Sequence, residues 1–251
     1  MILGPWELAL LVVAGVGAGL TGSIAGLASL VSYPALLAVG LPPVAANVTN
    51  TVSLTGSTLG AVMGSRPELT GQWGRLRRLC LITATGGAAG GALMLSTPPE
   101  LFQSIVPWLI GGASIMLLFG QRLRAALSHR GGDGIGPVTG VAAFAVAVYG
   151  GYFGAAAGVL MLALLSTVWS QSLARTNAAK NIATGSANLI AAAVFAAIGP
   201  VHWPAATALC AGSLVGAWIG PWLVRRLPAA PLRYAICAAG LALAVHLSVQ
   251  G

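Results

Sequence analysis

Charge is what this sequence has least of. Only 6% of its 251 residues are charged, and Asp and Glu together number four, whereas 57% are hydrophobic. A water-soluble domain needs a polar shell that this composition does not supply. The acidic residues all fall in expected loops or at segment ends, where water can solvate them. They are Glu7, Glu68, Glu100 and Asp133. The sequence therefore predicts an all-α polytopic membrane protein with the lipid bilayer as its main partner.

Cysteines and catalytic motifs are scarce as well. The three cysteines, Cys80, Cys210 and Cys237, lie in apolar segments without metal-ligand spacing, so neither disulfides nor a metal site is expected. The sequence has no metalloprotease pair, nucleophile elbow or phosphate loop, and no carboxylate inside an apolar run could act as a general base. We expect no catalytic residues, no cofactor and no enzymatic activity. The 12 Lys and Arg residues are dispersed, which argues against a nucleic-acid partner.

Long apolar runs define the expected elements. Six of them come near the ~20 residues that a spanning helix needs. They are predicted as helices at 47–65, 79–96, 102–121, 177–198, 204–224 and 233–249. Segments 6–40 and 137–169 are too long, because each would be roughly 50 Å as one helix against a ~30 Å hydrocarbon core. We expect each of these two segments to be a broken or re-entrant hairpin that turns at its glycine cluster.

The sequence also contains an internal repeat. A shift of 132 residues aligns the glycines of the two hairpin segments, and a shift of 130 aligns the helices that follow. The aligned pairs include Gly22 with Gly154, Gly26 with Gly158, Asn47 with Asn177, Trp73 with Trp203 and Gly86 with Gly216. The first repeat is predicted at 1–121 and the second at 135–251, joined by a cytoplasmic linker at 122–134.

Equivalent loops in the two copies differ in their positive charge. The loop at Trp73 carries Arg66, Arg75, Arg77 and Arg78, whereas the loop at Trp203 carries no Lys or Arg. The loop after Pro228 and its counterpart at Pro98 show the opposite bias. Because Lys/Arg-rich short loops stay in the cytoplasm, equivalent loops are predicted on opposite membrane faces. The expected fold is two inverted repeats, each a hairpin followed by three transmembrane helices, with eight to ten membrane segments in all.

Polar residues gather on one face of two repeat-related helices. In one copy this face holds Asn47, Asn50, Thr51, Thr55 and Thr58, and in the other it holds Asn177, Lys180, Asn181, Thr184 and Asn188. The candidate site residues among them are Asn47, Asn50, Thr51, Asn177, Lys180 and Asn181. Amide and hydroxyl donors beside a cation suit an oxyanion. The alternative is that Lys180 reaches the cytoplasmic interface while the other residues bond between helices.

The hairpin glycines complete the candidate site. Glycines at a turn permit a close approach of backbone to backbone or to a ligand. Exposed backbone at this depth must face protein or a water-filled cavity, so we expect the tips to border the substrate path. Helix packing alone is the alternative. The candidate glycines are Gly22, Gly26, Gly154 and Gly158.

Four stretches carry a resemblance to a known family. They are GLTGSIAG at 19–26, LPPVAANVTNTVSLTGSTLG at 41–60, GGYFGAAAG at 150–158 and TNAAKN at 176–181. Together they resemble the two repeats of the sulfite exporter TauE/SafE family, over essentially the whole chain. The resemblance implies transport of sulfite, sulfoacetate or related organosulfonates across a bacterial cytoplasmic (inner) membrane. Family members usually have more glycines after the first turn, where this chain has Ala25 to Ser29.

These observations favour a secondary transporter with its site between the two hairpin tips. An anion channel on the same scaffold is the alternative, because no intramembrane carboxylate offers a visible proton relay. A membrane subunit without transport activity ranks below both. The expected substrate is a small sulfur oxyanion or organosulfonate, and a homodimer is left open.

Overall fold

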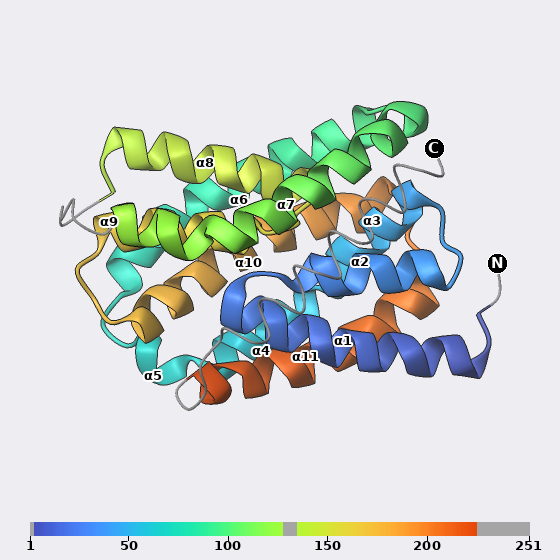
Figure 1. Cartoon of the computed structure of the whole chain (residues 1–251), viewed down its shortest axis with the longest axis horizontal. Helices are drawn as coiled ribbons and strands as arrows, with labels where there is room; N and C mark the ends of the chain where they lie inside the picture. The colour runs from blue at the N-terminus through green and yellow to red at the C-terminus, as the bar shows by residue number, and fades with distance from the viewer. Residues whose placement is uncertain (1–2, 128–134, 225–251) are drawn as a thin grey trace.

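Helices make up the regular structure of the computed structural model in the residues that it describes, 3–127 and 135–224, without the side chains of residues 114, 116–127 and 224. The long helices run roughly side by side along one axis (Figure 1). In chain order they are α1 (Pro5–Ala25), α2 (Ala28–Ala38), α3 (Pro43–Ser53), α4 (Thr55–Gly64), α5 (Arg66–Leu69), α6 (Trp73–Ser96), α7 (Pro99–Leu127), α8 (Pro137–Tyr152), α9 (Ala157–Val168), α10 (Leu173–Ile198) and α11 (Trp203–Val224). The helix predicted at 233–249 and the linker residues 128–134 lie outside the described residues.

The two long segments of the sequence each fold as helix, break, helix. α1 and α2 are separated by Gly26 and Leu27, and Gly26 has the left-handed φ of 78° that closes the end of α1. Between α8 and α9, Gly154 (φ 77°) and Ala156 (φ 59°) turn the chain. In Figure 1, α1 and α8 begin at opposite ends of the molecule, and both hairpins turn inside it.

The two breaks touch each other. A Cβ on Gly26 would lie 2.5 Å from the Cα and carbonyl carbon of Gly158, so the backbones pass each other without room for a side chain. These two glycines occupy equivalent positions in the two copies of the sequence. The two hairpins therefore meet through equivalent positions of the two sequence copies.

The other helices pack in pairs that correspond between the two sequence copies. α1 packs against α11 and α8 packs against α6, while α4 packs against α11 and α10 against α6. Small residues make these contacts close: a Cβ on Gly15 would meet the backbone of α11, and one on Gly86 would meet that of α8. Such small-residue interfaces let membrane helices approach closely.

Helix bounds differ from the sequence expectations in one informative place. The segment predicted as one helix at 47–65 begins at Pro43 and is interrupted at Leu54, between α3 and α4. Beside the interruption, the hydroxyls of Ser53 and Thr55 donate to the carbonyls of Asn50 and Val52, at 2.7 and 2.8 Å. Hydroxyl bonds to the preceding turn compete with the helix ladder and bend it.

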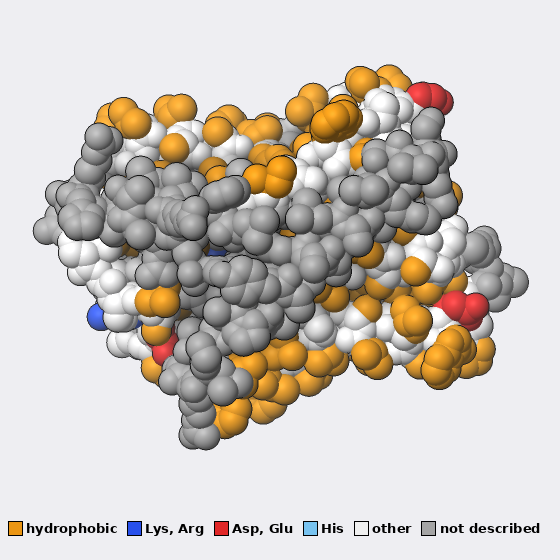
Figure 2. All heavy atoms as spheres, viewed as in Figure 1, with side chains coloured by type: hydrophobic (Ala, Val, Ile, Leu, Met, Phe, Trp, Pro, Cys, Tyr) orange, Lys and Arg blue, Asp and Glu red, His pale blue; other side chains and the backbone are white. Residues whose placement is uncertain are grey.

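The outside of the molecule is apolar along its flanks. Four described helices, α1, α6, α10 and α11, are long and apolar enough to cross a membrane. Large apolar side chains are exposed on them, including Val13 at 72% and Leu81 at 68%. Figure 2 shows hydrophobic side chains over the flanks and acidic ones near the ends. This surface matches a hydrocarbon solvent, and the chain is a membrane protein.

The contact of the two breaks generates a stability prediction. Gly158→Ala should lower the free energy of unfolding by about 1–3 kcal/mol, because the added methyl collides with the backbone of Gly26. The thermal midpoint of the detergent-solubilised protein measures the effect. Gly112→Ala is the control, since a Cβ there meets nothing within 4 Å. Equal midpoints for the two variants would contradict the close contact.

Candidate functional site

A cavity of about 90 Å³ lies where the two hairpin breaks meet. Its walls come from both breaks, from α4 with the end of α3, and from the middle of α10 and α8. All four glycines predicted at the hairpin tips line it, together with Thr51 and Asn181. The other polar lining residues are Ser29, Ser57, Thr58, Thr184 and Asn188. The cavity thus joins residues far apart in the chain.

Two helices begin at the cavity. Ala28 and Ser29 open α2, and Ala157 and Gly158 open α9, and all four line the cavity wall. The residues before them, Leu27 and Ala156, make no side-chain cap to the first turn. Helix N-termini present N–H groups and the positive end of the helix dipole. The two N-termini therefore favour a negative ligand between them.

Hydroxyl and amide donors add to these N-termini. Ser29 Oγ accepts a hydrogen bond from Asn50 Nδ2 at 3.1 Å, which leaves its own hydrogen to donate. Within the part of the chain that the structure describes, Ser57 Oγ has no hydrogen bond. Asn181 and Asn188 each donate one side-chain amide N–H to a backbone carbonyl. The second N–H of each side chain can donate to a ligand.

Two of these donors were missed by the sequence analysis. Ser29 and Ser57 do not belong to either predicted polar face. Ser29 could have been noticed as a serine in the first turn after a glycine break. Ser57 carries no such signal, because the bend at Leu54 that helps place it was not predicted.

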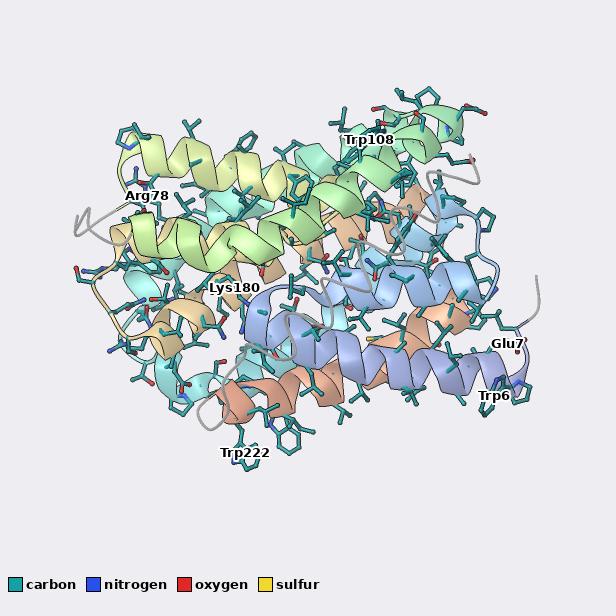
Figure 3. All side chains as sticks on the ribbon, viewed as in Figure 1. Trp6, Glu7, Arg78, Trp108, Lys180 and Trp222 are labelled. Atoms are coloured by element: carbon teal, nitrogen blue, oxygen red, sulfur yellow. The ribbon has the colours of Figure 1, made fainter. Side chains whose placement is uncertain are left out.

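Lys180 stands directly behind the cavity wall. Its side chain is 0% exposed and does not reach the surface of the molecule. The ammonium Nζ donates to Gly22 O at 3.0 Å and lies 3.5 Å from Ser23 O. Figure 3 shows Lys180 in the interior, beside the turn between α1 and α2. Because Gly22 is itself a wall residue, the charge lies one residue away from the cavity.

Asn47 and Asn177 hold the two breaks from behind. Asn177 Nδ2 donates to Ser23 O at 2.8 Å, at the end of α1. Asn47 Nδ2 donates to Tyr152 O at 2.9 Å, at the end of α8. Each asparagine thus caps the hairpin of the other repeat. Asn50 hydrogen-bonds to two serines of α2, donating to Ser29 and accepting from Ser32. Of the ten predicted site residues, six line the cavity, and these two asparagines, Asn50 and Lys180 lie outside its wall.

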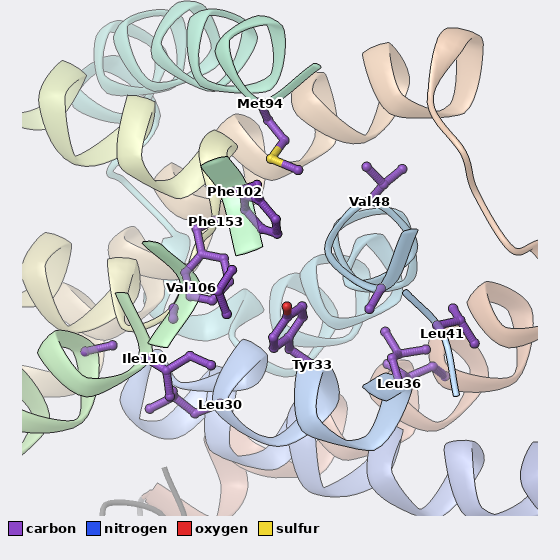
Figure 4. Close-up of a cluster of buried hydrophobic side chains, with 14 of the residues drawn as sticks. Leu30, Tyr33, Leu36, Leu41, Val48, Met94, Phe102, Val106, Ile110 and Phe153 are labelled. Carbon is purple, nitrogen blue, oxygen red and sulfur yellow. The ribbon is translucent and has the colours of Figure 1, made fainter. Parts of the chain in front are cut away.

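Apolar clusters pack on two sides of the cavity. Phe153 lines it and stacks edge-on against Tyr33, with ring centroids 5.4 Å apart, in a cluster that also holds Phe102 and Met94 (Figure 4). Met161 lines it too and belongs to a second cluster with Leu76. Leu76 lies in the first turn of α6 and Met94 in the last. The two clusters therefore lie toward opposite ends of the molecule.

Three similar proteins are all named as probable membrane transporters. A protein of Haemophilus influenzae, named "Probable membrane transporter protein", is 29% identical over 233 residues, covering 89% of this chain and 88% of its own length. YfcA of Escherichia coli K12, with the same designation, is 26% identical and covers 82% and 77%. ORF9 of a Sinorhizobium species, named likewise, is 26% identical and covers 96% and 92%. No solved structure matches the chain.

The sequence profile of one family matches nearly the whole chain. It is the sulfite exporter TauE/SafE family, and the match covers residues 11–247. That span includes both hairpin breaks, the cavity and the buried lysine behind it. The chain belongs to the sulfite exporter TauE/SafE family of membrane transporters.

Proposed function

We propose that the protein is a secondary transporter that carries small sulfur-containing anions, such as sulfite, sulfoacetate or related organosulfonates, across the bacterial inner membrane. The anion binds in the cavity between the two hairpin breaks. The observation that carries the proposal is that the N-termini of α2 and α9 both open on this cavity, with the ammonium of Lys180 behind its wall.

Electrostatics in this place favour an anion. The carboxylates of the described residues, Glu7, Glu68 and Glu100, lie in the first turns of α1, α5 and α7 rather than at the cavity. Unit charges interact several times more strongly at a low effective dielectric constant than in water. The buried ammonium and the two helix dipoles therefore attract an anion, while the free hydroxyl and amide hydrogens fix its oxygens.

The membrane orientation belongs to the same proposal. Arg78 lies at one end of the molecule and Glu7 at the other (Figure 3). Short loops rich in arginine remain in the cytoplasm, so the end with Arg78 is cytoplasmic. α1 then enters from outside and α8 from inside, which makes the two repeats inverted. As part of the same proposal, the protein crosses the bacterial inner membrane several times.

Binding and flux measurements test the function. Isothermal titration of the purified protein with sulfite, thiosulfate, sulfate, sulfoacetate and taurine should give saturable binding for at least one of these ligands. In proteoliposomes, uptake of that ligand should saturate and show counterflow. Uptake without saturation or counterflow would indicate the anion channel instead. Absence of both binding and flux for all five ligands would contradict the proposal.

Ser57 provides a sharp test of the cavity as the site. Ser57→Ala should weaken binding of the best anion by roughly 10-fold or more, because a hydrogen bond to a charged group contributes about 1.5–3 kcal/mol. Ser96→Ala is the matched control, since this serine is exposed at the end of α6. Titration calorimetry measures both. Unchanged affinity in Ser57→Ala would place the anion away from this wall.

The inverted arrangement predicts opposite sidedness for equivalent positions. Single cysteines at Gly74, in the first turn of α6, and at Pro204, in the first turn of α11, are introduced after removal of the native three. Both positions are exposed. An impermeant thiol reagent added to intact cells should label Pro204→Cys from outside, and Gly74→Cys only after permeabilisation. Labelling of both from one side would contradict the inversion.

A further inference from the structure

The end of α1 leaves a carbonyl group that the backbone does not satisfy. The N–H groups of Gly26 and Leu27 donate to Gly22 O and Thr21 O, at 2.8 and 3.3 Å. Ser23 O instead receives side chains of α10. Asn177 Nδ2 lies 2.8 Å from it, Asn181 Nδ2 3.4 Å and Lys180 Nζ 3.5 Å. In a membrane an unpaired carbonyl costs several kcal/mol, so this cap is required.

A cation is well suited to this position. The C-terminal end of a helix carries the negative end of its dipole, and Lys180 places its ammonium on the last turn of α1. In transporters with discontinuous helices, such carbonyl ends coordinate the coupling cation. Here a covalently attached ammonium takes that position. Lys180 does not line the cavity, so its contacts are with the protein and not with the space where the ligand lies.

The second hairpin is held differently. At the end of α8, Asn47 donates to Tyr152 O and the hydroxyl of Tyr149 donates to Ala155 O. Asn50 is the counterpart of Lys180 in the repeat, and it binds serines of α2 rather than the end of α8. Only neutral donors thus hold the end of α8 in the described residues, whereas a charged donor holds the end of α1.

We propose that Lys180 is a positioning residue of the transport site, which fixes the break of the first hairpin against α10. By holding the end of α1, the ammonium keeps the N-terminus of α2 directed into the cavity. It acts on the anion through this position and through its field, without contact. The inference rests on the proposed function only in taking the cavity as the anion site.

Accessibility of the break tests the proposal without any ligand. Ala28 lines the cavity at the start of α2, and Ala28→Cys in a background without the native cysteines reports on the break. Lys180→Met should raise the rate of labelling by a small thiol reagent by roughly 10-fold or more, since it removes a charge-assisted hydrogen bond. Lys180→Arg should restore slow labelling. Arg175→Met is the control for charge, because Arg175 lies on the same helix but is exposed.

Two further variants keep the test decisive. Asn177→Ala removes the shortest bond to Ser23 O without changing the charge, and it should also accelerate labelling, though less than Lys180→Met. In Lys180→Ala, methylammonium should slow the labelling again, because it can occupy the vacated ammonium position. A general loss of packing would not respond to the amine. Folding of each variant is checked by its elution profile in detergent.

The outcomes separate the two proposals. Unchanged labelling in both Lys180→Met and Asn177→Ala would overturn the positioning role, whatever the wild-type protein binds. If Lys180→Met does not fold, unchanged labelling in Asn177→Ala alone would overturn it. Accelerated labelling that methylammonium reverses supports the role even if none of the tested anions binds. Failure of the wild type to bind or move any anion affects only the proposed function.

Discussion

The fold depends on satisfying backbone groups where a helix stops inside a membrane. Lipid offers no hydrogen bonds, so each broken helix needs partners from the protein for its last carbonyls. The two breaks obtain them crosswise, from Asn177 for α1 and from Asn47 for α8. The same breaks leave the N-termini of α2 and α9 at one cavity. The breaks thus have their capped helix ends, of α1 and α8, on one side. On the other side the two helix N-termini favour negative charge in the cavity.

Much of this arrangement could be predicted from the sequence. Apolar runs and the ~30 Å thickness of a bilayer require segments 6–40 and 137–169 to break, and the glycine clusters indicate where. The six candidate residues taken from the repeated polar faces lie in the cavity wall or directly behind it. The reason is that in a chain with few polar residues, those inside apolar runs need partners, and the partners available are the breaks.

The roles of individual side chains could not be predicted in this way. The helical period predicts that Asn177 and Lys180 lie on the same face of their helix, but it does not predict which groups of other helices they bind. The carbonyl end of α1 comes from a segment more than 150 positions earlier in the chain, as the separation of 154 between Asn177 and Ser23 shows. Ser57 was missed for a related reason. Its place depends on the bend at Leu54, where hydroxyl bonds to the backbone override the helical period.

The crosswise caps have a consequence for each half of the chain considered alone. Neither half of the chain supplies the asparagine that binds the last carbonyls of its own broken helix, since Ser23 O and Tyr152 O each accept from an asparagine of the other half. A half taken alone would leave one of these carbonyls unpaired inside the bilayer, which costs several kcal/mol. Each half therefore depends on the other for the place of its broken helix in the membrane.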